Sequence, residues 1–336
     1  GSESVNFFSD KGFDVIGIDN NLRKFFFGND GSTIWIKNNL KKRNKNFRHF
    51  NIDIRNYEAL EKIFKKNKNK ISLIIHCAAQ PSHDYGKKFP FLDFHVNATG
   101  TLNLLELTKT FCPNAPFIFM STNKVYGDNP NKLQIYENKT RWELKNKDKN
   151  FKGIDENFSI DNSTHSFFGV SKTYADLIVQ EYGKNVGLKT VCFRGGCITG
   201  PNHSGAKLHG FLSYLVKTSL LKKKYIMIGY KGKQVRDNLH SEDLVNCFWE
   251  FYKKPRHGEV YNMGGGRFSN CSILEALEMV EKLCKIKIKR KIIKSPRVGD
   301  HIWYISNLNK FKKHYPKWKQ KYNTKKIIEE LINNFK

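Results

Sequence analysis

The chain has 336 residues, 39% of them hydrophobic and 13% aromatic, a composition that is typical of a folded protein of about two domains and excludes a disordered one. The formal net charge is +28, yet 48 of the basic residues are Lys and only 11 are Arg, which reads phosphates and bases better than Lys does. We therefore expect solvated surfaces with no nucleic-acid or membrane partner, and an anionic small-molecule substrate would suit the positive field.

Two further classes of protein are disfavoured. The sequence contains no run of about 18 apolar residues that could span a membrane. It also shows no charged segment followed by an apolar one, so nothing argues for secretion. The seven cysteines are dispersed and include no C-x-x-C pair, so we expect neither a disulfide framework nor a metal site. The predicted location is a reducing compartment, the cytoplasm.

Short apolar runs alternate with helical patterns through the first half of the chain. We expect buried strands at residues 13–18, 47–50, 71–76, 115–120 and 189–193. Helical patterns cover about residues 3–11, 56–68, 90–111 and 168–186. This alternation predicts an α/β fold with a doubly wound parallel sheet. Ligands of such sheets lie beyond the carboxyl ends of the strands, so we expect the chemistry in the loops that follow them.

The pattern changes after about residue 194. A loop rich in Gly and His at residues 195–210 leads into a helix at about 211–222, and the elements that follow form no long parallel series. We therefore predict a larger domain of residues 1–193 plus about 238–262. A smaller C-terminal lobe of about 194–237 plus 263–336 would bind the substrate.

Polar residues follow several of the predicted strands. Asp19 ends the first, where a carboxylate can accept both hydroxyls of an adenosine ribose, although an Asp at a strand end is more often a simple turn former. Asp53 follows the next strand and would meet an adenine edge. His-Cys-Ala-Ala-Gln (76–80) follows the third, and its small residues let the backbone approach a diphosphate closely.

Two longer motifs lie further along the chain. Ser-Thr-Asn-Lys-Val-Tyr-Gly (121–127) directly follows a predicted strand, and Phe-Gly-Val-Ser-Lys (168–172) begins a helix about fifty residues later. With Gly-Lys-Gln-Val-Arg-Asp at 232–237, in this order and spacing, the sequence resembles the extended short-chain dehydrogenase/reductases, in particular the NAD-dependent epimerase/dehydratase group acting on nucleotide sugars. The resemblance runs from residue 1 to about 331. It implies a Rossmann-like first domain that binds NAD and a second lobe that binds a nucleotide sugar.

The resemblance assigns a role to each matching position. The catalytic positions are Thr122, which would polarise the reacting sugar hydroxyl, Lys172, and Phe168, which stands where the family has Tyr. The cofactor-binding positions are Gly1, Asp19, Asn20, Asp53, Ile54, Ala78, Ala79, Gln80, Asn97, Ser121 and Lys172. The substrate-binding positions are Asn123, Lys124, His203, Arg236 and His301. The resemblance implies no metal.

One departure from the family pattern concerns the cofactor. The turn G-x-x-G-x-x-G after a first strand is absent, and Gly1-Ser2-Glu3 resembles its last glycine at the start of a helix. We expect that the first strand and its turn are missing from the sequence given, with a Gly-Ser tag remnant as the competing interpretation. Without that turn the pyrophosphate loses backbone donors and its place at a helix N-terminus.

The second departure concerns proton transfer. The family's Tyr-x-x-x-Lys is Phe168-x-x-x-Lys172 here, a spacing that keeps both side chains on one helix face but removes the phenol. General acid–base groups contribute roughly 10²–10⁴-fold to a rate, so another group must serve or activity is lost. Thr122, Lys172, His165, Cys197 and His203 are the alternatives, each with an ordinary structural role as the competing interpretation.

The leading hypothesis is a nucleotide-sugar epimerase that oxidises a sugar carbon, by resemblance C2, and returns the hydride to the other face. A reductase or dehydratase of the same group is the first alternative, and a non-catalytic binder of NAD or nucleotide sugars is the second. Nucleic-acid binding rests on charge alone and would collapse between about 50 and 200 mM salt. By resemblance, the helices at 90–111 and 168–186 would pair across a two-fold axis in a homodimer.

Overall fold

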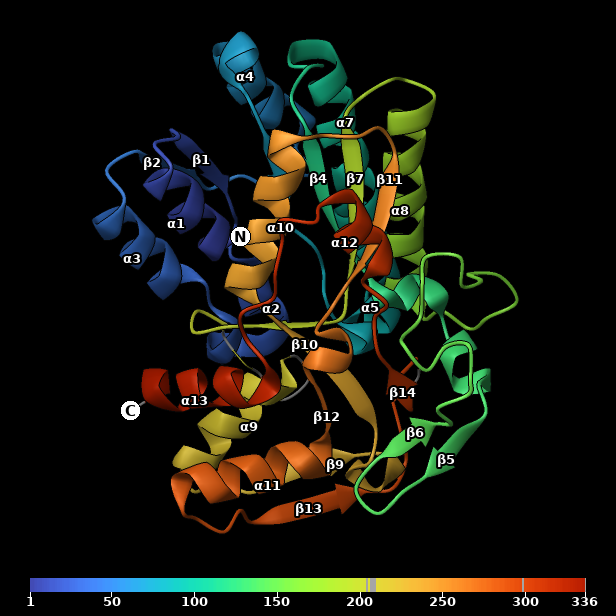
Figure 1. The fold of residues 1–336 in the computed structure, drawn as a ribbon. Helices are drawn as coiled ribbons and strands as arrows, with labels where there is room; N and C mark the ends of the chain where they lie inside the picture. The colour runs from blue at the N-terminus through green and yellow to red at the C-terminus, as the bar shows by residue number, and fades with distance from the viewer. Residues whose placement is uncertain (204, 206–209, 298, 336) are drawn as a thin grey trace. The chain divides into compact units, whose positions relative to one another are not determined.

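The computed structural model describes residues 1–203, 205, 210–297 and 299–335 (Figure 1). The predicted loop at 195–210 therefore lies partly outside the described residues. The chain divides into two compact units. The first unit consists of residues 1–125, 167–194 and 245–261, and the second of residues 126–166, 195–244 and 262–336.

The strands of the first unit form two separate sheets. β1 (Val15–Ile18) pairs in parallel with β2 (Phe47–Phe50). The other sheet has the order β11–β7–β4–β3, and β3 pairs with β4 in parallel. Its strands are β3 (Ile74–His76), β4 (Phe117–Thr122), β7 (Thr190–Gly195) and β11 (Glu259–Met263). Within the described residues no strand joins β1 to β3, so the predicted single sheet is two sheets here.

Helices cover both faces of the larger sheet. Successive side chains of a strand point to opposite sides, so each face has apolar side chains that a helix can cover. Phe117 and Phe119 of β4 belong to one core cluster with side chains of α7 (Gly100–Phe111) and α8 (Phe167–Lys184). Phe193 of β7 instead contacts Phe248 of α10 (Ser241–Lys253), with the ring centroids 5.5 Å apart. The doubly wound arrangement that the sequence predicted is confirmed.

Three more helices of the first unit lie in the predicted helical segments to within about two residues: α1 (Ser2–Asp10), α4 (Tyr57–Asn67) and α6 (Pro90–Phe94). Three others were not predicted: α2 (Leu22–Phe27), α3 (Ile34–Arg43) and α5 (His83–Lys88). A π turn at His95–Thr99 joins α6 to α7, so the predicted helix at 90–111 is helical throughout. No described helix has the length and hydropathy needed to cross a membrane.

The second unit is built around β10 (Val235–His240). This strand pairs with β8 (Cys197–Thr199), β12 (Asn270–Ser272) and β14 (Trp303–Tyr304). Two smaller sheets pair β9 (Tyr225–Ile228) with β13 (Arg290–Ile293), and β5 (Ile135–Glu137) with β6 (Trp142–Leu144). The helices are α9 (Phe211–Leu220), α11 (Ile273–Cys284), α12 (Asn309–His314) and α13 (Thr324–Phe335).

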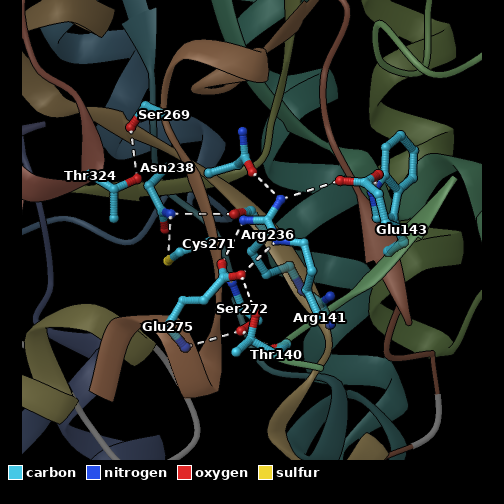
Figure 2. A network of polar contacts seen from close by, with 12 residues as sticks. Thr140, Arg141, Glu143, Arg236, Asn238, Ser269, Cys271, Ser272, Glu275 and Thr324 are labelled. Carbon is cyan, nitrogen blue, oxygen red and sulfur yellow. Dashed lines mark hydrogen bonds and ion pairs between the residues drawn. The ribbon is translucent and has the colours of Figure 1, made fainter. Parts of the chain in front are cut away.

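The predicted domain boundaries differ from this division at two places. Residues 126–166 were placed with the first domain but belong to the second unit. Figure 2 shows one reason: Arg141 forms an ion pair of 2.5 Å with Glu275 at the start of α11. Residues 238–244 also belong to the second unit, because β10 continues to His240 and pairs there with β8. These contacts join segments far apart in the sequence, which local patterns do not reveal.

Candidate active site

Asp19 lies directly after β1 with its side chain exposed. Its Oδ1 accepts the backbone N–H of Asn21 at 2.7 Å and the Thr33 hydroxyl at 3.0 Å. Both contacts use the same oxygen, so they fix the carboxylate without using Oδ2. Thr33 lies 14 residues after Asp19, and no local pattern in the sequence predicts their contact.

The side chains of Asp53 and Ile54 contact other residues of the first unit. Asp53 accepts hydrogen bonds from Arg55 at both carboxylate oxygens and from the Asn20 amide at 2.8 Å. The bonds from Arg55 hold the pKa of the Asp53 carboxyl below its ordinary value. Ile54 is buried, and a Cβ on Gly100 would lie 2.5 Å from its Cδ1. Their predicted roles at the adenine stay predictions.

The Asn97 side chain forms two hydrogen bonds with the backbone of the turn after β3. The Asn97 Oδ1 accepts the Gln80 backbone N–H at 2.9 Å, and its amide donates to the Gln80 carbonyl at 3.2 Å. Ala78 and Ala79 precede Gln80 and are half-buried. The Asn97 side-chain amide is thus used in contacts within the protein, and its predicted role at a cofactor stays a prediction.

A buried carboxylate connects this turn to α8. Asp93 accepts the Ser171 hydroxyl at 2.5 Å and the Gln80 side-chain amide at 2.5 Å. Burial raises the pKa of Asp93, and the two hydrogen bonds oppose that shift. Asp93 was not among the predicted residues. Its two hydrogen bonds link Gln80 to Ser171, the residue that precedes Lys172.

His76, at the end of β3, is a buried structural residue. The Thr101 hydroxyl donates to the Asn97 carbonyl at 2.6 Å, so it accepts from the His76 Nε2–H at 2.9 Å. Burial lowers the pKa of His76 to about 3, so the imidazole is neutral.

A hydrogen bond joins the end of β4 to α8, and an ion pair joins the same carboxylate to β7. Asp176 accepts the Ser121 hydroxyl at 2.5 Å and two hydrogen bonds from the Arg194 guanidinium, at 2.8 and 3.1 Å. The Asp176 and Arg194 side chains are only 1% and 6% exposed. Ser121, predicted to bind the cofactor, is thus anchored to the helix that carries Lys172.

Lys172 is buried against β4. Its Nζ donates to the Met120 carbonyl at 2.7 Å and lies 4.0 Å from the centroid of the Phe119 ring. Burial lowers the pKa of Lys172 to about 8, although the Asp176 charge partly opposes this. The structure therefore places a buried amine with a lowered pKa at the position of the family's lysine.

We expect the affinity for NAD+ to fall as the pH rises through about 8, because Lys172 loses its positive charge there. The contribution of Lys172 to the free energy of unfolding changes with pH in the opposite direction. Its pKa is lower in the folded state than in the unfolded chain, so the free energy of unfolding should rise between pH 8 and about 10.4. Calorimetric titrations and urea unfolding across this range measure both trends. Lys172→Met should flatten both, and an unchanged NAD+ affinity from pH 7 to 9 would contradict the assignment.

Thr122 ends β4 and is followed by the two predicted sugar contacts. The Thr122 Oγ1 accepts the Lys124 backbone N–H at 3.2 Å and lies 3.5 Å from the Asn123 Oδ1. Phe168, in the first turn of α8, is 7% exposed. The structure brings Thr122, Ser121 and Lys172 together where the end of β4 packs on α8 in the first unit.

The predicted substrate residues of the second unit lie in polar contacts. Arg236 forms an ion pair of 2.7 Å with Asp300, a residue that the sequence analysis missed. His301 is fully buried, and its Nε2 lies 2.7 Å from the Gly127 carbonyl oxygen. His203 is half-buried, with its Nδ1 3.5 Å from the Thr199 hydroxyl. If Arg236 binds a diphosphate, its guanidinium must therefore either release Asp300 or contact Asp300 and the diphosphate together.

Three further positions complete the predicted set. Gly1 is the N-cap of α1, and a Cβ there would meet nothing within 4 Å, so sterics do not require glycine. His165 has its Nδ1 3.1 Å from the Ser163 carbonyl oxygen, and Cys197 lies half-buried in β8. Among the described residues, no group of three or more His, Cys, Asp or Glu side chains is arranged to hold a metal ion.

The sequence matches the model of the NAD dependent epimerase/dehydratase family over residues 1–264. CDP-paratose 2-epimerase of Salmonella typhi is 29% identical over 342 residues, covering 99% of this chain and 95% of that protein. UDP-glucuronate 4-epimerase of Thermodesulfobacterium geofontis is 27% identical over 301 residues, covering 89% and 82%.

A solved structure has the same fold over the whole chain. It is a tyrosine-to-phenylalanine variant of UDP-glucuronic acid 4-epimerase from Bacillus cereus, in complex with UDP-4-deoxy-4-fluoro-glucuronic acid and NAD. Its TM-score is 0.80 at 22% identity, covering 100% of this chain and 95% of that one.

The chain belongs to the NAD dependent epimerase/dehydratase family. The predicted family, the Rossmann-type fold and the class of enzyme are confirmed. NAD, the predicted cofactor, is the cofactor of this family.

Proposed function

We propose that this chain is an NAD-dependent nucleotide-sugar epimerase of the CDP-paratose 2-epimerase type. The observation that carries the proposal is the buried Lys172, held by the Met120 carbonyl just before Thr122 at the carboxyl end of β4. By the family resemblance, a hydroxyl at this strand end would polarise the sugar hydroxyl, and the lysine would hold the nicotinamide ribose. The likeness to CDP-paratose 2-epimerase over nearly the whole of both chains supports the choice of substrate.

The residues of the first unit fit the dinucleotide at two points. Asp19 is exposed at a strand end, with one oxygen fixed by Thr33 and Asn21, which suits recognition of ribose hydroxyls. The turn at Gln80 is fixed through its backbone by Asn97, so it presents a rigid surface to a ribose or diphosphate. When bound, NAD+ supplies the hydride acceptor that makes the sugar oxidation reversible.

The chain's own residues then orient and polarise the substrate. Thr122 would hold the reacting hydroxyl, and Lys172 would hold the nicotinamide ribose by its ammonium group. Asn123 and Lys124 would contact the sugar, and Arg236 and His301 would contact the nucleotide diphosphate. Each of these roles comes from the family resemblance, and His203 is assigned to the substrate on the same basis.

The test is turnover of CDP-paratose in the presence of NAD+, followed by NMR of the sugar ring. We expect inversion at C2 with no net change in the NAD+ concentration. Net consumption of reduced cofactor would instead identify the reductase alternative. Loss of water from the sugar would identify a dehydratase, which Asn123 and Lys124 disfavour because they supply no carboxylate. Tight binding of NAD+ and CDP-paratose without turnover would favour the non-catalytic binder, the alternative suggested by Phe168.

We propose that the enzyme is a homodimer that pairs α6 and α8 of each subunit. These helices carry a row of exposed apolar side chains, at odds with a fully solvated surface. Its members are Phe91, Phe94, Phe167, Val170, Tyr174 and Leu177, which are 38–80% exposed. The Phe94 and Tyr174 rings are 5.8 Å apart, so the row is continuous across the two helices.

A Val170→Glu variant should shift the protein from dimer to monomer, because a buried unpaired carboxylate at the interface is costly. Light scattering after size-exclusion chromatography measures the mass. The matched control is Ile292→Glu on β13, which replaces a side chain of similar exposure, 53% against 58%, away from these helices. A dimer that persists in the Val170 variant, or is lost in the control, would contradict the assignment.

A further inference from the structure

The position of the family's tyrosine is occupied by a side chain that has no proton to transfer. Phe168 lies in the first turn of α8, four residues before Lys172. The imidazole of His83 packs against its ring, with the centroids 5.1 Å apart and the planes at 63°. His83 is half-buried and comes from a different element, the first residue of α5.

The backbone around His83 is fixed in several places. The Gln80 side chain accepts the Ser82 backbone N–H at 2.6 Å and donates to the Ser82 carbonyl at 2.8 Å. Ser82 also caps α5 by accepting the Tyr85 N–H. His83 therefore follows directly on the rigid turn that faces the proposed cofactor site.

The helix that carries His83 also packs closely on the start of α8. A Cβ on Gly86 would lie 3.0 Å from the Phe168 backbone nitrogen and 3.0 Å from the Asp93 Oδ1. Asp93 in turn accepts the Ser171 hydroxyl. A glycine at 86 thus permits a close approach that places the imidazole against Phe168.

Three of the five alternatives named from the sequence are placed less well to exchange a proton with a sugar hydroxyl. The Lys172 Nζ is directed to the Met120 carbonyl and the face of the Phe119 ring. The His165 Nδ1 faces the Ser163 carbonyl oxygen within the second unit. A threonine hydroxyl such as Thr122 is a poor base at neutral pH, whereas an ordinary imidazole titrates near pH 6.5.

We propose that His83 replaces the missing phenol as the catalytic proton acceptor and donor. The inference rests on the epimerase function proposed above. In the oxidation, the sugar hydroxyl gives its proton to the imidazole while the carbon gives its hydride to NAD+, so the C–OH becomes a C=O. In the return step the carbonyl oxygen recovers the proton from the imidazolium as the hydride adds to the other face. No further oxidant or reductant is consumed.

The test is a cycle of four chains: the unmodified chain, His83→Gln, Phe168→Tyr, and the double variant, with CDP-paratose and NAD+. We expect His83→Gln to lower turnover by about 100-fold or more in the unmodified background. In the Phe168→Tyr background the same change should cost less than about threefold, because the restored phenol then transfers the proton. His257→Gln, an exposed histidine of the same unit, is the control and should change turnover little.

A second readout does not depend on turnover. The imidazole NMR signals of His83, identified by their loss in His83→Gln, should shift when NAD+ and CDP-paratose are added together, and those of His257 should not. A His83→Gln variant as active as the unmodified chain would overturn the inference, as would an equal loss in both backgrounds or an unmoved His83 signal. An unmodified chain that binds NAD+ but does not epimerise CDP-paratose contradicts the proposed function, and the NMR result then decides on His83 separately.

Discussion

Replacing Lys172 with Met should lower the turnover of the enzyme by at least about 100-fold, because the variant keeps the packing of the side chain and loses its donor and charge. The ammonium group lies buried at the end of β4, in contact with the Met120 carbonyl and the Phe119 ring. A charge in such a place interacts strongly with any bound ligand, since solvent screens it little.

The control for this variant is Lys184→Met on the same helix. Lys184 is exposed and donates to the Gln180 side chain at 3.2 Å, so its replacement should change turnover by less than about twofold. Initial rates at saturating NAD+ and sugar nucleotide measure both variants. Turnover of Lys172→Met within about threefold of the unmodified chain would show that the amine has no part in the reaction.

Replacing Asp176 with Asn should lower the free energy of unfolding by about 3–5 kcal/mol, because it leaves the buried Arg194 guanidinium without its counter-charge. The change also weakens the anchor of Ser121, whose hydroxyl donates to Asp176. We therefore expect NAD+ affinity to fall along with stability.

Urea unfolding followed by circular dichroism measures this effect. Glu61→Gln removes one partner of the exposed ion pair with Lys65 on α4, and it should cost only about 0.3–0.5 kcal/mol. Equal losses of stability in the two variants would contradict the view that the Asp176–Arg194 pair anchors this strand end.

The sequence predicted those parts of the fold that depend on local pattern. The strand Phe117–Thr122 begins with a run of four apolar residues between helical patterns, and the ends of β1 and β4 carry the polar residues expected there. Thr122 and Lys172 were singled out by the resemblance, and the structure adds the contact of Lys172 with the Met120 carbonyl.

Contacts between distant segments could not be predicted in the same way. Thr33 reaches back to Asp19, and Asp93 bonds with Ser171 across 78 residues, with no periodic signal at either position. The contact of His83 with Phe168 also joins residues far apart in the sequence. Asp176 is an exception, since it lies four residues after Lys172 and helical spacing alone could have suggested it.

The assignment of residues 126–166 was wrong for a related reason. This segment follows β4 in sequence, so proximity along the chain favoured the first domain. Its pairing partners are instead the Lys233 carbonyl, Glu275 and Ser306, all of which lie in later parts of the chain. Only the three-dimensional structure shows these partners.

Binding of NAD+ is best tested by calorimetric titration into this chain, beside the same chain preceded by a strand and a G-x-x-G-x-x-G turn. We expect saturable binding by the extended chain at least. Asp19→Ala and Lys172→Met should each weaken binding by about tenfold or more, the effect of losing one hydrogen bond to a charged group. No saturable binding by either chain, or binding that both substitutions leave unchanged, would contradict this expectation.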